Sequence, residues 1–74
     1  MTKSVFTEEN LKVIEHVKES KEKELVLANT IIQKYKEILT EEETKFLENI
    51  KEKLSFEIEK TDKLIKNFQT FLNI

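Results

Sequence analysis

The sequence predicts an all-α protein folded as an antiparallel hairpin of two long helices. Apolar residues recur at intervals of three and four along two segments, about 8–38 and 41–73, which is the spacing of amphipathic helices. The chain of 74 residues contains neither Gly nor Pro, which argues against β-hairpins and their tight turns. Charged and apolar residues each make up 38% of the chain, a balance typical of exposed amphipathic helices. One all-α domain spanning 1–74 is expected.

The first helix is predicted to begin after Thr7, whose hydroxyl can cap the free backbone amides of the residues that follow. Phe6 and Leu11 then have the spacing of a hydrophobic staple. Residues 1–6 are expected to be a flexible lead-in. The apolar positions of this helix form one heptad pattern: Leu11, Ile14, Leu25, Ala28, Ile32, Tyr35 and Leu39.

The wholly polar segment 18–24 leaves two interpretations open. The chain could break near 18–22, with Ser20 capping a new helix, and form a three-helix bundle. Alternatively, the first helix continues through this segment, since every residue in it except Ser20 is a good helix former. The continuous helix is the favoured interpretation.

Thr40 and Glu43 have the spacing of a capping box, which predicts that the second helix begins at this point. The pattern then continues through Leu47, Ile50, Leu54, Leu64, Phe68 and Phe71. Folding the chain back at residues 39–40 places the polar interruptions of the two helices at the same level. Lys18, Lys21, Glu57 and Thr61 are therefore predicted to form a polar layer. The layer either fixes register and partner choice or is simply hydrated by long lysine side chains.

A single hairpin would leave many large apolar side chains exposed to water. We therefore expect two copies to pair into a four-helix bundle as a homodimer, or the hairpin to dock on a helical protein partner. The candidate interface residues are Val26, Leu27, Phe56, Phe68, Phe71 and Leu72. The apolar residues near the C-terminus also fit core packing against the start of the first helix.

Composition argues against several functional classes. Without Cys, the chain can form neither disulfides nor thiolate metal sites. Net charge is −2 and all basic residues are Lys, so nucleic-acid binding is not favoured. A membrane-spanning or signal segment is not apparent, and a cytoplasmic protein is expected. No catalytic, cofactor or metal site is predicted. An Arg-free chain rich in Lys, Ile and Asn also fits an AT-rich genome, such as that of a low-GC bacterium or its phage.

The expected function is therefore non-catalytic: a small regulator, inhibitor or adaptor that binds another protein through its helical faces. In outline, the predicted hairpin is similar to the ROP-type plasmid regulators. That resemblance implies a dimer that binds structured RNA, here through outward lysines such as Lys12, Lys23 and Lys34. A helical hairpin with an exposed His16 also resembles histidine-kinase dimerisation domains and implies phosphotransfer. However, the Pro-containing box of those domains is missing after His16.

Overall fold

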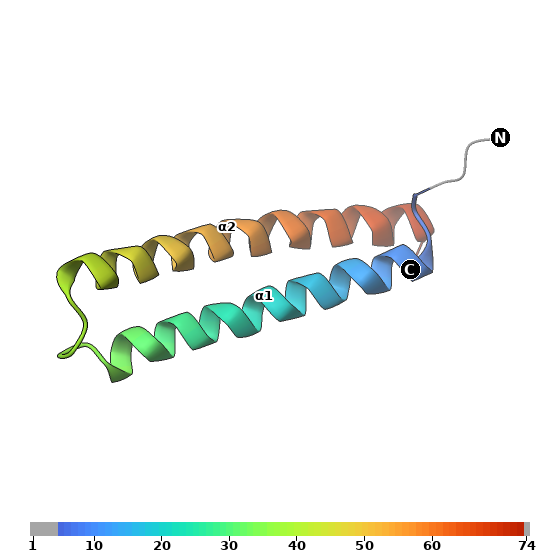
Figure 1. The fold of residues 1–74 in the computed structure, drawn as a ribbon. Helices are drawn as coiled ribbons and strands as arrows, with labels where there is room; N and C mark the ends of the chain where they lie inside the picture. The colour runs from blue at the N-terminus through green and yellow to red at the C-terminus, as the bar shows by residue number, and fades with distance from the viewer. Residues whose placement is uncertain (1–4, 74) are drawn as a thin grey trace.

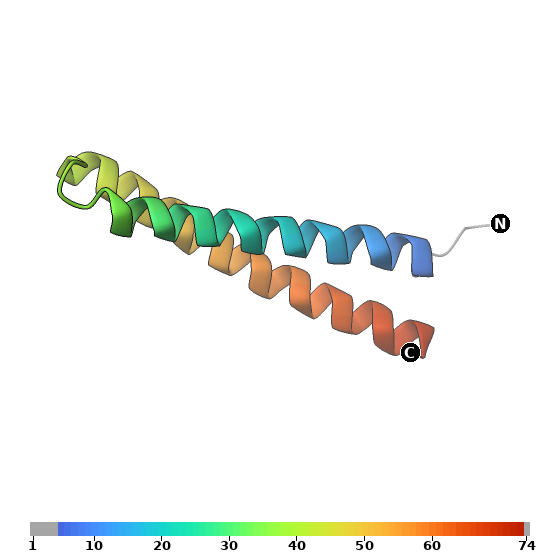
Figure 2. The same cartoon turned by 90° about the horizontal axis from the view of Figure 1, so that it is seen from below.

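The computed structural model describes residues 5–73 and shows two helices, α1 (Glu8–Lys34) and α2 (Glu41–Leu72). They lie side by side in opposite directions, joined by one loop, and both chain ends lie at the other pole (Figure 1). Viewed after a quarter turn, the two helices are inclined to each other (Figure 2). The antiparallel hairpin is thus confirmed. The alternative with a break near 18–22 is wrong, because α1 is continuous through that segment.

Local hydrogen bonds fix the start of α1 where the sequence places it. The Thr7 hydroxyl accepts from the backbone N–H of Asn10 at 3.1 Å. The Asn10 side-chain amide donates in turn to the carbonyl of Val5 at 2.9 Å. Glu8 and Glu9 add negative charge to the first turn, where the helix dipole is positive.

The end of α1 differs from the prediction, which extended this helix to residue 38. Tyr35 leaves the helix with φ −112° and ψ 22°, although its N–H still donates to the Ile31 carbonyl at 3.0 Å. The N–H groups of Ile38 and Leu39 both donate to the Tyr35 carbonyl, at 3.0 and 2.9 Å. The physical reason is the distance that the loop must span between the two helices. The axes of packed helices lie about 8–10 Å apart, and two residues span at most about 7 Å. Unwinding 35–38 supplies the missing length.

The capping box at the start of α2 is confirmed. Thr40 is extended, with φ −72° and ψ 163°. Its hydroxyl accepts from the Glu43 N–H at 3.1 Å, and its own N–H donates to the Glu43 carboxylate at 2.9 Å. Hydrogen bonding to the backbone N–H of Thr40, and after it to the Thr40 side chain, lowers the pKa of the Glu43 carboxyl. The helix ends at Asn73, which adopts the left-handed conformation at φ 62°.

A buried cluster of Leu11, Ile65 and Phe68 closes the pole that holds the chain ends. Phe6 packs against this cluster, and its ring lies 4.9 Å from that of Phe68 and 4.3 Å from that of Phe71. Packing therefore begins within the expected lead-in, of which residues 1–4 lie outside the described residues. Further along the hairpin, the buried residues are Ala28, Ile32 and Leu54.

The row of buried residues in α2 shifts gradually around the helix from its start to its end. The heptad pattern placed Leu64 and Phe71 in the core, but they are 43% and 63% exposed. Their neighbours Ile65 and Leu72 are more deeply buried. A straight helix has 3.6 residues per turn and drifts about 20° per heptad, so a strict seven-residue pattern leaves the core after a few repeats.

The hairpin is long and its core is thin. It measures 57 × 17 × 17 Å, with a radius of gyration of 16.6 Å. A compact chain of this length would have a radius of about 11 Å. Among the described residues, no large side chain is fully buried. Two helices alone therefore provide little hydrophobic stabilisation, and most apolar side chains remain partly wet.

Candidate protein interface

The predicted polar layer exists as paired charges between the helices. The Lys21 ammonium donates to the Glu57 carboxylate at 2.9 Å, and Lys18 donates to Asp62 at 3.0 Å. Thr61, the expected partner of Lys18, instead donates its hydroxyl to the backbone carbonyl of Glu57 at 2.7 Å. Asp62, the residue after Thr61, is thus the partner of Lys18.

A third inter-helix contact lies nearer the loop. Lys51 donates to the side-chain carbonyl of Asn29 at 3.0 Å. Sequence reasoning missed this contact and the part played by Asp62. Both contacts follow from the antiparallel register when α2 is treated as a straight helix, in which the inward-facing positions shift gradually away from a strict seven-residue pattern.

Three of the groups in these pairs have shifted pKa values. The hydrogen bond from Lys21 lowers the pKa of Glu57 below its ordinary value of 4.5. Hydrogen bonds from Lys18 and then Lys66 lower the pKa of Asp62 below 3.8. The hydrogen bond to Asp62 raises the pKa of Lys18 above 10.5. The side chains of Lys18 and Lys21 are still 27% and 25% exposed, so solvent screens both pairs.

One flank of the hairpin is polar. Residues of both helices line a groove along it: Glu15, Lys18, Glu19 and Glu22 of α1 with Asp62, Ile65, Lys66 and Gln69 of α2. Each helical residue is turned about 100° from the previous one. The groove residues therefore lie on one side of the row of buried residues in each helix. Residues on the other side of each row share the opposite flank of the hairpin.

That opposite flank, here called the apolar flank, carries most of the exposed apolar surface. Eight of the twelve exposed large apolar side chains among the described residues belong to it. They are Val13, Val17, Leu27, Ile31 and Tyr35 of α1 with Phe46, Leu64 and Phe71 of α2. Ser20, Glu24, Lys53 and Lys60 occupy the same flank in its middle part.

A simple sequence signal marks this flank. In α1, positions 13, 17, 20, 24, 27, 31 and 35 repeat at intervals of three and four, parallel to the row of buried residues. In α2, Phe46, Lys53 and Lys60 are spaced by seven, as are Leu64 and Phe71. The pattern is visible in the sequence, but only the hairpin shows that both lines share one flank.

The predicted interface residues are distributed over several surfaces. Val26, Leu27 and Phe56 are 60–65% exposed. Val26 and Leu27 lie in a shallow depression on the outer surface of α1, together with Glu19, Glu22 and Lys23. The Lys60 ammonium lies 5.2 Å from the centre of the Phe56 ring. Leu27 also belongs to the apolar flank, whereas Val26 lies on another side of α1 and stays open when that flank is covered.

The other three predicted interface residues lie at the pole of the chain ends. Phe68 is 5% exposed and belongs to the core of the hairpin, so it presents almost no surface to a partner. Leu72 is half-buried against the same cluster. Phe71 is exposed on one side and stacked on Phe6 on the other.

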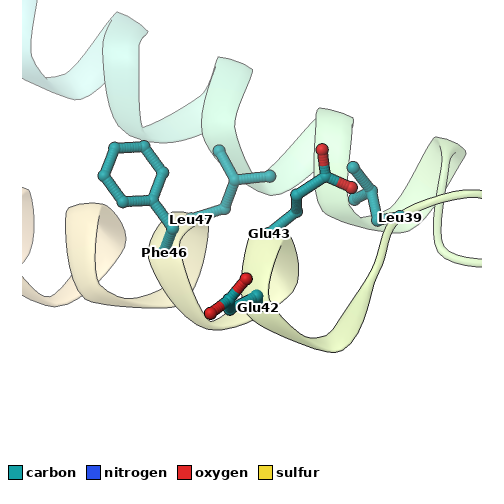
Figure 3. Close-up of a pocket in the computed structure, with 5 residues that line it drawn as sticks. All are labelled: Leu39, Glu42, Glu43, Phe46 and Leu47. Carbon is teal, nitrogen blue, oxygen red and sulfur yellow. The ribbon is translucent and has the colours of Figure 1, made fainter.

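A second shallow depression lies beside the loop. It is lined by Leu39, Glu42, Glu43, Phe46 and Leu47. Figure 3 shows the Glu42 side chain turned away from those of Phe46 and Leu47, which leaves an apolar surface next to the capping box. Phe46 thus extends the apolar flank as far as the loop.

The residues considered for other functions lie on the surface. His16 is exposed, as are Lys12, Lys23 and Lys34 on α1. Within residues 5–73, no group of three or more His, Asp or Glu side chains could hold a metal ion. In that same part of the chain, neither helix is both long and apolar enough to cross a membrane.

Comparison of the chain with protein-family models, curated proteins and solved structures found no match.

Proposed function

We propose that this protein is a non-catalytic interaction module: a homodimer of two hairpins that regulates another protein by binding it. The single observation that supports the proposal is the gathering of eight exposed large apolar side chains on one flank of the hairpin. Large apolar side chains gathered on one exposed face mark protein-binding sites, because leaving them in water forfeits hydrophobic stabilisation. Pairing two such flanks gives a four-helix bundle.

Molecular mass in solution tests the first part of the proposal. Light scattering should give twice the chain mass of 8.8 kDa over a wide range of concentration. Ile31→Lys places a charge in the apolar part of this flank nearest the loop and should shift the mass toward 8.8 kDa. Gln33→Lys, at an exposed position outside this flank, is the matched control and should leave the dimer intact. A well-folded wild-type monomer at high concentration would refute the homodimer.

The regulatory part of the proposal requires a surface that the second copy leaves free. The part of the outer depression around Val26 meets this requirement, because Val26 lies away from the apolar flank, unlike Leu27 at the other side of the depression. Affinity capture from the native cell should retain a protein on the wild type but not on Val26→Glu, with both baits dimeric. Retention of the same proteins by both baits would show that the depression is not the binding site.

A further inference from the structure

We infer that the second copy seats on the apolar flank with its loop at the same end, so that the twofold axis runs along the hairpin. The inference deepens the proposed homodimer by fixing the surface and the orientation. In this arrangement α1 of each copy packs against α2 of the other. The alternative axis, perpendicular to the helices, places the loops at opposite ends and packs α1 on α1 and α2 on α2.

The area of the flank suits a second copy. The hairpin is 57 Å long and 17 Å wide, so one flank offers roughly 900 Å² per copy, close to the ~800 Å² per partner of a standard stable interface. The flank also runs the full length of the hairpin, from Phe71 at the terminal pole to Phe46 at the loop. A partner of the same length and shape would cover all of it.

Rotation about an axis along the hairpin does not change the position of any residue along that axis. Residues of α1 and α2 that are level within one chain are therefore also level between the two copies. Within the chain, Lys21 is level with Glu57 and Asn29 is level with Lys51. At a rise of about 1.5 Å per residue, Tyr35 then faces Phe46 of the other copy to within about one residue. Counted from Lys18, which is level with Asp62, Val17 faces Leu64 of the other copy to within about one residue. Apolar side chains thus meet apolar side chains on both sides of the charged middle of the flank.

The charged middle of the flank matches in the same way. Glu24 comes level with Lys53 of the other copy to within about two residues, which juxtaposes opposite charges. Twofold symmetry gives two such pairs in the dimer. Within the described part of one chain, neither Glu24 nor Lys53 is in a salt bridge.

The perpendicular axis gives a poorer match. When two antiparallel copies of α2 (Glu41–Leu72) overlap completely, residues at equal distances on either side of the helix midpoint face each other. Lys53 then faces Lys60 of the other copy, twice, and like charges are brought together. Phe46 faces Asn67, and Leu64 faces Asn49, so large apolar groups lie opposite amides. Charge and burial therefore both favour the arrangement with adjacent loops.

A distance between the two loops decides the orientation. Because the chain has no Cys, Glu37→Cys in the exposed loop gives one spin-label site per copy. Every dipolar distance then comes from two different chains. Adjacent loops should give a distance far below the 57 Å length of the hairpin, whereas opposite loops should give one near that length. A long distance overturns the inference and leaves the homodimer standing. Absence of any dipolar signal at high concentration overturns both.

A charge exchange tests the contact itself. Glu24→Lys should weaken the dimer about tenfold, since two attractive pairs become repulsive. The double variant Glu24→Lys with Lys53→Glu should recover the affinity of the wild type to within about threefold. Glu15→Lys, on the polar flank, makes the same charge change and should leave the affinity unchanged. Circular dichroism checks helicity in each variant. No recovery in the double variant would overturn the pairing of Glu24 with Lys53.

Discussion

At the scale of single residues, two threonines determine where the helices begin. Thr7 and Thr40 each accept a hydrogen bond from a backbone amide three residues ahead, at 3.1 Å in both cases. Thr40 has a reciprocal partner in Glu43, which Thr7 lacks because Asn10 occupies that position and bonds to Val5 instead. The chain has no Gly to form a tight turn. The Thr40 cap is therefore the main local device that separates α2 from the loop.

Thr40→Ala should lower the free energy of unfolding by about 1 kcal/mol, because the Glu43 amide loses its hydrogen-bond acceptor. Urea denaturation followed by helical circular dichroism measures the change. Ser55→Ala, at an exposed position in the middle of α2, should leave stability equal or slightly higher, since Ala is the better helix former. An equal loss in both variants would contradict the capping role.

At the scale of helices, the polar layer interrupts the apolar contact between α1 and α2. Its charged pairs are only partly exposed, and each ammonium meets one carboxylate at 2.9–3.0 Å. A pair of this kind adds little stability but disfavours other registers, in which a charge would face an apolar residue. The observed hydrogen bonds favour the register interpretation over simple hydration of the lysines.

Replacing Lys21 and Glu57 together by Leu should raise the thermal midpoint, because apolar contact replaces a partly desolvated ion pair. If the layer fixes the register, the same variant should also form more than one oligomer, which native mass spectrometry would detect. Lys21→Leu alone leaves Glu57 without its lysine and should lower the midpoint. A more stable double variant with a single uniform oligomer would rule out the register role.

Stability should depend on pH at both extremes. Glu57 and Asp62 have lowered pKa values in the fold, so their contribution is full above their ordinary values of 4.5 and 3.8 and is lost as pH falls through the lowered values. Lys18 has a raised pKa, so its contribution is full below 10.5 and is lost as pH rises through the raised value.

Thermal midpoints across pH should therefore show a plateau between these limits and fall on both sides. Asp62→Asn should flatten the acidic fall, because it removes one of the three carboxylates, with Glu43 and Glu57, whose pKa is lowered in the fold. Glu52→Gln, at an exposed position on α2, is the matched control and should leave the profile unchanged. An identical acidic fall in Asp62→Asn and the wild type would contradict the role of the Lys18–Asp62 pair.

At the scale of the whole molecule, the hairpin has one polar and one apolar flank. The polar flank carries charged side chains such as Glu15, Glu19 and Lys66. The apolar flank carries eight large aliphatic or aromatic side chains, among them Val13, Ile31 and Leu64. A second layer of helices would both enlarge the thin core and bury the apolar flank. Folding and association should then be coupled.

The thermal midpoint should consequently rise with protein concentration. For a dimer of this size, linkage predicts a rise of about 5 °C for each tenfold increase in concentration. Calorimetry over several dilutions measures it. The Ile31→Lys variant, in which the apolar flank is interrupted, should show a lower midpoint with a weaker dependence. A midpoint that does not change with wild-type concentration would mean that the hairpin folds without a second copy.

The sequence by itself determined the two helices, the cap at Thr40, the continuity of α1 and the level at which Lys21 meets Glu57. These features depend on nearest neighbours and on residue counts along the chain, because capping and helical periodicity are local. The exposure of Leu64 was not foreseen, since a strict heptad ignores the 3.6-residue turn.

Only the tertiary structure decided where α1 ends and which residues share a flank. The loop must bridge the distance between two packed axes, and so Tyr35 leaves the helix. Val17 and Leu64 are far apart in the sequence, and they join one apolar flank only after the hairpin closes with a particular side of each helix turned inward. That choice depends on the mutual rotation of the two helices, which no single helix specifies.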